Sequence, residues 1–149
     1  MKALAACALS VTVCWGAANS DYPYQPVPLN QVSIREGFWL PRFETNRLVT
    51  VWADFRKSEE TGRISNFARA GKLEEGPFRG IPFDDSDVFK IVEGAAYTLA
   101  THPDPKLETY LDRLIAKMAA AQEPDGYLYT ARTLGFTNGM TGKERWSNL

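Results

Sequence analysis

The chain has 149 residues, a formal net charge of −1 and 23% charged residues. These values fit one globular domain and give no sign of a nucleic-acid-binding protein or of a charged tail. The two cysteines, Cys7 and Cys14, both lie in the first twenty residues, so the rest of the chain has no disulfide, thiol nucleophile or thiolate ligand for zinc.

The first twenty residues, "MKALAACALSVTVCWGAANS", have the order of a secretory leader. Lys2 is followed by an apolar run, and Ala18 and Ser20 fit a small-x-small cleavage site. The run is shorter than the ~20 residues that a membrane span needs. Residues 1–20 therefore predict a signal peptide and a secreted or periplasmic protein. A buried N-terminal helix and a lipoprotein modified at Cys14 are the weaker alternatives.

The stretch that follows changes from an extended to a helical pattern. Three prolines in residues 21–30 predict a proline-rich arm, and Val32 and Ile34 alternate with polar residues as in a short strand. Pro41 suits the first residue of a helix, and apolar side chains then recur at helical spacing as far as Phe55. We expect a helix over roughly 41–56, then an irregular stretch over 57–85 that holds one short helix around "ISNFARAG".

Two longer helices are expected in the second half of the chain. Apolar residues over 88–99 follow helical periodicity, and Gly94 within them predicts the close approach of a neighbouring helix. Asp104 and Pro105 are a good N-cap and first helical residue, and the turn "PDG" ends that second helix near Gln122. Residues 127–132, "YLYTAR", are expected to be extended. The chain is therefore predicted to be mainly α, and the apolar face over 88–99 is typical of the first helices of a larger helical array.

The acidic block in "PFDDSDVFK" (residues 82–90) has more than one interpretation. Glycoside hydrolysis uses two carboxylates in one cleft, and metal binding needs further ligands that are absent nearby. A helix start explains the residues more simply, with Ser86 or Asp85 as the N-cap and Asp87 in the first turn. We favour the helix start over direct catalysis.

Other candidate residues have ordinary structural interpretations as the favoured ones. His102 is expected in an exposed turn, and Glu93 is expected to be solvated or paired on its helix. Two tyrosines, Tyr127 and Tyr129, follow the turn and either pack in the core or stack on a ligand. Core packing is also expected for the three aromatic residues Trp39, Phe43 and Trp52.

Several segments in order resemble glycoside hydrolase family 127, the β-L-arabinofuranosidase-type family. They are "REGFWLPR", "ISNFARAG", "FRGIPFDDSDVFKIVEGAAYTLA", "HPDPKLETYLDRLI", "AAAQEPDGYLYT" and "RWSNL", within residues 31–149. The resemblance implies a partial (α/α)6 barrel, of which this chain supplies only the first helices. It also implies exo-acting hydrolysis of a terminal sugar, most simply L-arabinofuranose from plant-type glycans. In that family a cysteine nucleophile in a zinc site of cysteines and a glutamate, with another glutamate as acid/base, is held to do the chemistry.

None of that machinery can be placed on residues 21–149, which have no cysteine. We therefore expect residues 31–149 to be the truncated N-terminal portion of the catalytic domain, inactive alone, with the zinc ligands beyond Leu149. Carbohydrate is the expected partner, and the substrate-binding candidates are Phe83, Asp85, Asp87 and, more weakly, Asn66. A non-catalytic carbohydrate-binding or scaffold segment and a relative acting on another terminal sugar are the alternatives. Neither the oligomeric state nor the exact linkage follows from the sequence.

Overall fold

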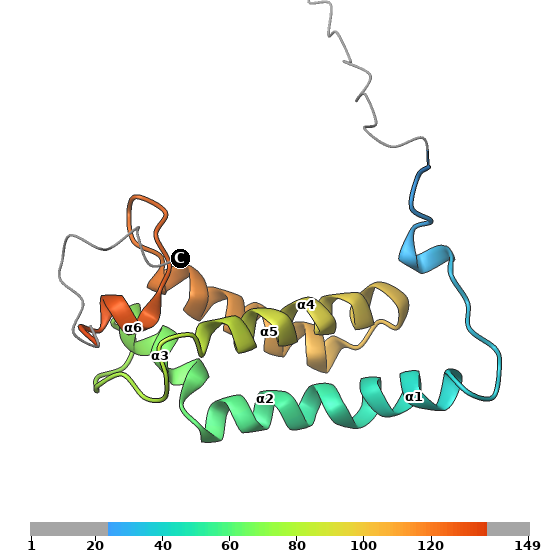
Figure 1. Ribbon diagram of the computed structural model, residues 1–149, viewed down its shortest axis with the longest axis horizontal. Coiled ribbons are helices and arrows are strands. Elements are labelled where there is room, and N and C mark those ends of the chain that lie inside the picture. Colours follow the sequence, from blue (N-terminus) through green and yellow to red (C-terminus); the bar gives the residue numbers. More distant parts are fainter. Residues whose placement is uncertain (1–23, 137–149) are drawn as a thin grey trace, which may run out of the picture.

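The computed structural model describes residues 24–136, and every regular element in that range is helical (Figure 1). The elements are the 3₁₀ turn η1 (Leu29–Gln31), α1 (Leu40–Thr45), the π-helical segment η2 (Asn46–Thr50), α2 (Val51–Glu60), α3 (Arg63–Ala70), α4 (Asp85–Thr101), α5 (Pro105–Ala121) and α6 (Thr130–Thr133). In Figure 1, α1 and α2 form one long rod beneath the antiparallel pair α4 and α5. The short helices α3 and α6 lie at one end, and the extended arm leaves from the other. The mainly α fold expected from the sequence is confirmed.

The first helical run is longer than its apolar pattern indicated. It begins at Leu40 and reaches Glu60 without a break in helical backbone, and its π-helical part lies at 46–50. The strand expected around Val32 does not form in the described residues. Val32 does have extended backbone angles (φ −95°, ψ 126°), but an extended segment becomes a strand only when a second one pairs with it.

The core lies where α2, α3, α4 and α5 meet. Its largest fully buried side chains include Phe55, Ile64, Phe67, Val88 and Leu107, one or two from each of these helices. Each such side chain stabilises the fold by about 1.5–3 kcal/mol relative to an exposed position. The amphipathic stripes seen in the sequence therefore hold the helices together. The short helix around "ISNFARAG" is confirmed as α3, so the stretch 57–85 is more regular than expected.

A glycine does mark a close helix crossing, but it is not Gly94. A Cβ at Gly94 would meet nothing within 4 Å in the described residues, so the expected neighbour is absent there. A Cβ at Gly71 would instead lie 2.8 Å from the backbone carbon of Ala120. Gly71 directly follows α3, so the close approach that needs a missing side chain is between α3 and α5.

The predicted boundaries of α5 are confirmed. Asp104 is the N-cap, its side chain accepts hydrogen bonds from the backbone N–H of Lys106 (2.9 Å) and Leu107 (3.2 Å), and the helix ends before Gln122. The extended prediction for 127–132 holds only up to Tyr129 (φ −158°, ψ 99°), because α6 begins at Thr130. That helix start depends on a residue far away in the sequence, as described below.

Several apolar side chains stay exposed on the described part of the chain. Trp39 and Phe43 are 54% and 50% exposed, so the expectation that they are core residues is wrong within residues 24–136. Trp52 is half-buried against the core and makes an edge contact with Tyr110 at 5.8 Å between ring centroids. None of the described helices has the length and apolarity to cross a membrane.

Candidate functional site

The acidic block lies where α3, α4 and α6 meet, and its first carboxylate, Asp84, serves the loop. Asp84 is the N-cap of α4, in place of the expected Ser86 or Asp85, and its side chain accepts no hydrogen bond from that helix. One oxygen accepts from the backbone N–H of Ile81 (3.1 Å), and the other pairs with Arg63 (3.1 Å). Gly80 allows this turn because it has φ +97° and because a Cβ there would overlap Asp84 Oδ2.

Asp85 joins two helices that are distant in the sequence. It is only 5% exposed. Its Oδ2 accepts from the backbone N–H of Thr130 (2.7 Å), and its Oδ1 accepts from the Thr130 hydroxyl (2.6 Å). The carboxylate therefore caps the first N–H group of α6, which explains why a helix begins at Thr130. Burial raises the pKa of the Asp85 carboxyl above its usual value, although the two hydrogen bonds from Thr130 oppose the shift.

Asp87 lies in the first turn of α4, as predicted, and also takes part in an ion-pair network. Its carboxylate oxygens lie 3.2 Å from Arg63 Nε and 3.4 Å from Lys90 Nζ. Arg63 also pairs with Asp84, so one guanidinium connects α3 to two carboxylates at the start of α4. Asp87 remains partly exposed, with 46% of its side chain accessible, so the network has an open side.

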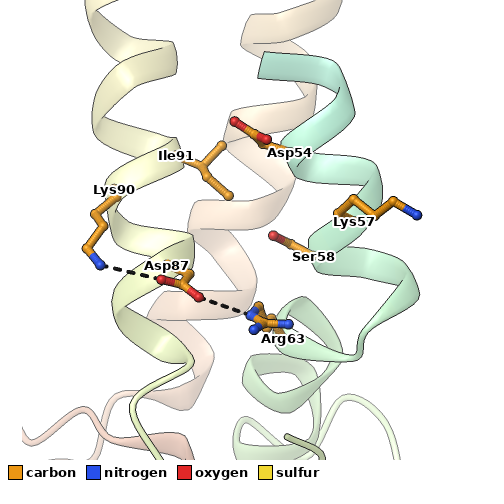
Figure 2. Close-up of a pocket in the computed structure, with 7 residues that line it drawn as sticks. All are labelled: Asp54, Lys57, Ser58, Arg63, Asp87, Lys90 and Ile91. Carbon is orange, nitrogen blue, oxygen red and sulfur yellow. Dashed lines mark hydrogen bonds and ion pairs between the residues drawn. The ribbon is translucent and has the colours of Figure 1, made fainter. Parts of the chain in front are cut away.

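That open side is part of a cleft between α2 and α4 (Figure 2). We call it the α2–α4 cleft. It has a volume of about 390 Å³. Figure 2 shows Asp54 and Ser58 pointing from α2 toward α4, and Ile91 pointing back from α4. The lining residues are Asp54, Lys57, Ser58, Arg63, Asp87, Lys90 and Ile91.

The structure places the four predicted substrate-binding residues in different surroundings. Asp87 lines the α2–α4 cleft, and Phe83 is 67% exposed just before α4. Asn66 is fully buried, and its amide donates to the carbonyl of Arg79 (2.8 Å) and accepts from the Arg79 N–H (3.0 Å). Asp85 and Asn66 thus use their polar groups to hold the fold. Contact of any of the four with substrate stays a prediction.

The sequence interpretation missed the α2 wall of the cleft. Asp54 and Ser58 are four residues apart, so a helix over this segment puts them on one face. That spacing was a usable signal. No sequence signal marked Arg63 as the residue that would connect α3 to the acidic block, because its partners are more than twenty residues away.

The other candidate residues from the sequence have the structural roles expected of them. His102 is exposed after α4, and exposed Glu93 accepts a hydrogen bond from the Tyr97 hydroxyl (3.1 Å). Tyr127 is buried, as expected for a core residue. Tyr129 is partly buried, and this burial together with the charge of Asp85 raises the pKa of its hydroxyl.

A zinc site does not fit the part of the chain that the structure describes. Zinc in proteins is held by several cysteine, histidine or carboxylate ligands. Within residues 24–136, no three such side chains come close enough together to hold a metal ion, and this range contains no cysteine. We therefore derive no chemical step through zinc from these residues.

Comparison with known proteins gives the family. Residues 31–149 match the model described as the catalytic domain of β-L-arabinofuranosidase, GH127. The chain belongs to glycoside hydrolase family 127. This result confirms the resemblance inferred from the ordered segments.

Three relatives of this GH127 chain show how much of the family it covers. A non-reducing end β-L-arabinofuranosidase of Bifidobacterium longum subsp. longum is 52% identical over 61 residues, which are 41% of this chain and 9% of that protein. The solved structure of a GH127 β-arabinofuranosidase is 47% identical, with a TM-score of 0.74 over 84% of this chain and 20% of its own. A GH127 β-L-arabinofuranosidase from Geobacillus stearothermophilus T6 is 32% identical, with a TM-score of 0.71 over 78% and 19%.

The GH127 chain therefore spans at most about a fifth of the length of these relatives. Its helices follow the same path as the matching part of two solved GH127 enzymes. This agreement supports the expected place of the helices within the family's catalytic fold.

Proposed function

We propose that the protein to which this chain contributes is an exo-acting glycoside hydrolase that releases terminal L-arabinofuranose from plant-type glycans. The observation that carries the proposal is the 47% identity, at a TM-score of 0.74, to a GH127 β-arabinofuranosidase. Two further relatives bear the β-L-arabinofuranosidase name. A family member that acts on another terminal sugar is the alternative within the same fold.

The described residues would contribute a helical wall and a few sugar contacts. They hold buried carboxylates engaged in structural bonds, and they lack a cysteine nucleophile. The cysteine nucleophile and the zinc ligands that the family resemblance implies would have to come from outside residues 24–136, which contain no cysteine and no cluster of three metal-binding side chains. The 149-residue chain alone is therefore expected to be inactive.

The test compares two proteins on one substrate. A GH127 protein that extends this chain to the length of its relatives is assayed on an aryl β-L-arabinofuranoside, beside the 149-residue chain, and the zinc content of both is measured. We expect release of the aryl group and bound zinc only with the longer protein. Turnover by the 149-residue chain would contradict the expectation that the catalytic groups lie outside it. A longer protein that is folded and zinc-loaded but inactive would contradict L-arabinofuranose as the sugar released.

Substitution of Asp87 distinguishes a structural role of its carboxylate from a role in substrate contact. Asp87→Ala removes a partner of both Arg63 and Lys90 at a partly exposed position, where ion pairs contribute about 0–1 kcal/mol. If Asp87 contacts substrate, the longer protein loses kcat/KM by at least about tenfold while its unfolding midpoint barely moves. Asp112→Ala, at an exposed position on α5, is the matched control. Unchanged kinetics in Asp87→Ala would remove Asp87 from the substrate contacts.

We further propose export of the protein by its leader. The support is the sequence of residues 1–20, with Lys2, an apolar run and Ala18 and Ser20 before the cleavage point. Mass spectrometry of protein collected outside the cytoplasm should give a mature N-terminus at Asp21. An intact Met1 on active protein would contradict export through this leader.

A further inference from the structure

The α2–α4 cleft contains a serine hydroxyl without a partner in the described residues. Ser58 is 3% exposed, and within residues 24–136 its hydroxyl makes no hydrogen bond. The Ser58 oxygen is not one of the side-chain atoms that are both buried from water and unpaired in these residues, so it keeps access to solvent. Figure 2 shows this hydroxyl directed from α2 into the cleft. The Ser58 hydroxyl is therefore available to form a hydrogen bond with a ligand that enters the cleft.

A second polar group on the same wall is also available. Asp54 lies one helical turn before Ser58 and points in the same direction (Figure 2). Its carboxylate takes part in no hydrogen bond or ion pair within the described part of the chain. Two neighbouring acceptors, one charged and one neutral, therefore face the cleft from α2.

The opposite side supplies one apolar surface and one ion pair. Ile91 points toward α2, and the pair of Arg63 and Asp87 closes one end of the cleft (Figure 2). Lys57 pairs with Glu60 (2.6 Å), which lies outside the cleft, whereas Lys90 pairs with Asp87 of the cleft itself (3.4 Å). The cleft therefore presents two carboxylates and a hydroxyl, together with the Arg63 guanidinium and the Lys90 amine.

This chemistry favours a neutral polyhydroxylated ligand. Sugar hydroxyls donate to carboxylates and to Ser58, they accept from Arg63, and the C–H face of a sugar ring packs on an aliphatic side chain such as Ile91. Arg63 and Lys90 are already paired with Asp87, so an anionic sugar would gain no unpaired cation there and would meet the unpaired carboxylate of Asp54. A metal ion lacks a three-ligand cluster among the described residues.

We propose that the α2–α4 cleft binds one neutral sugar unit through Asp54, Ser58, Arg63 and Asp87. The identity of that unit as L-arabinofuranose rests on the proposed function. The hydroxyl of Ser58 donates to or accepts from one sugar hydroxyl, and the carboxylate of Asp54 accepts from another.

The test measures equilibrium binding to the 149-residue chain, where hydrolysis does not interfere. Methyl β-L-arabinofuranoside and D-galacturonate are titrated separately and followed by ¹H–¹⁵N NMR shifts, with far-UV circular dichroism as the check of folding. We expect the neutral sugar to bind with shifts centred on residues 54–58 and 87–91. Galacturonate should bind at least about tenfold more weakly. Equal or tighter binding of galacturonate, or no binding of the neutral sugar by the folded chain, would overturn the proposal.

Two substitutions locate the site. Ser58→Ala removes a hydroxyl that has no partner in the described residues, so folding should be retained, and Asp54→Asn changes an exposed position. Each should weaken binding of the neutral sugar at least about fivefold, whereas Asp112→Asn on α5 should leave it unchanged. Unchanged binding in both Ser58→Ala and Asp54→Asn would refute the site.

The proposal and the proposed function fail separately. If the longer protein does not cleave an aryl β-L-arabinofuranoside but the cleft binds neutral sugar as above, the cleft proposal stands and the enzymatic proposal fails. If cleavage occurs but the substitutions at Ser58 and Asp54 change neither binding nor the NMR shifts, the cleft proposal fails alone.

Discussion

The contact between Asp85 and Thr130 gives a sharp prediction about stability. Thr130→Val keeps the shape of a fully buried side chain and removes only the hydroxyl that donates to Asp85 Oδ1 at 2.6 Å. A hydrogen bond to a charged group is worth about 1.5–3 kcal/mol. The bond from the Thr130 N–H to Asp85 Oδ2 at 2.7 Å would remain. The other oxygen of this buried carboxylate would lose its described partner. We therefore expect the free energy of unfolding to fall by about 2 kcal/mol.

The assay is urea unfolding at neutral pH, followed by the helical circular dichroism signal. For a urea m-value near 2 kcal/mol/M, within the ~1–3 kcal/mol/M range of small proteins, this loss moves the midpoint down by about 1 M. Thr130→Ser is the matched control because it keeps the hydroxyl and loses one methyl group, so its midpoint should fall less. Equal destabilisation by Val and Ser, or a Val variant as stable as the wild type, would refute the assignment of Asp85 as the tertiary cap of α6.

Four further predictions concern two glycines, a helix cap and a buried carboxyl group. Gly80→Ala should destabilise the protein by more than about 1 kcal/mol, because Gly80 has positive φ and its Cβ would overlap Asp84. Gly94→Ala should stabilise it by up to about 1 kcal/mol, because this helix position is open; thermal unfolding of the two variants side by side checks both signs. Asp104→Ala removes the side-chain cap of α5 and should cost about 0.5–2 kcal/mol in urea unfolding, and a change of zero would contradict the capping bonds. Asp85→Asn tests the raised carboxyl pKa. At a pH between the carboxyl's pKa in the unfolded state and its raised pKa in the folded state, the folded protein binds more protons than the unfolded protein. The stability that protonated Asp85 contributes is therefore complete below the unfolded-state pKa and is lost as the pH rises through the folded-state pKa. The Asn variant should lack that decline in unfolding free energies measured across the acidic range.

Local sequence signals predicted the helices that carry their own start and stop residues. Asp104, Pro105 and the turn after Gln122 bound α5 as expected, because capping and turn chemistry act within a few residues. The apolar stripes of the helices also named the core correctly for Phe55, Val88 and Leu107. The strand expected at Val32 failed because a strand needs a partner that a local alternation pattern cannot supply.

The sequence by itself thus determined the helical class, the family and the position of an acidic helix start, since all three are expressed in residues close together or in their order. Only the tertiary structure decided what each acid does. Asp85 caps a helix 45 residues away, Asp84 holds the preceding loop and Arg63, and Asp87 remains open to a cleft whose other wall is α2. The physical reason is that a carboxylate's role is set by the donors that folding brings to it, and these donors come from helices the local pattern does not connect.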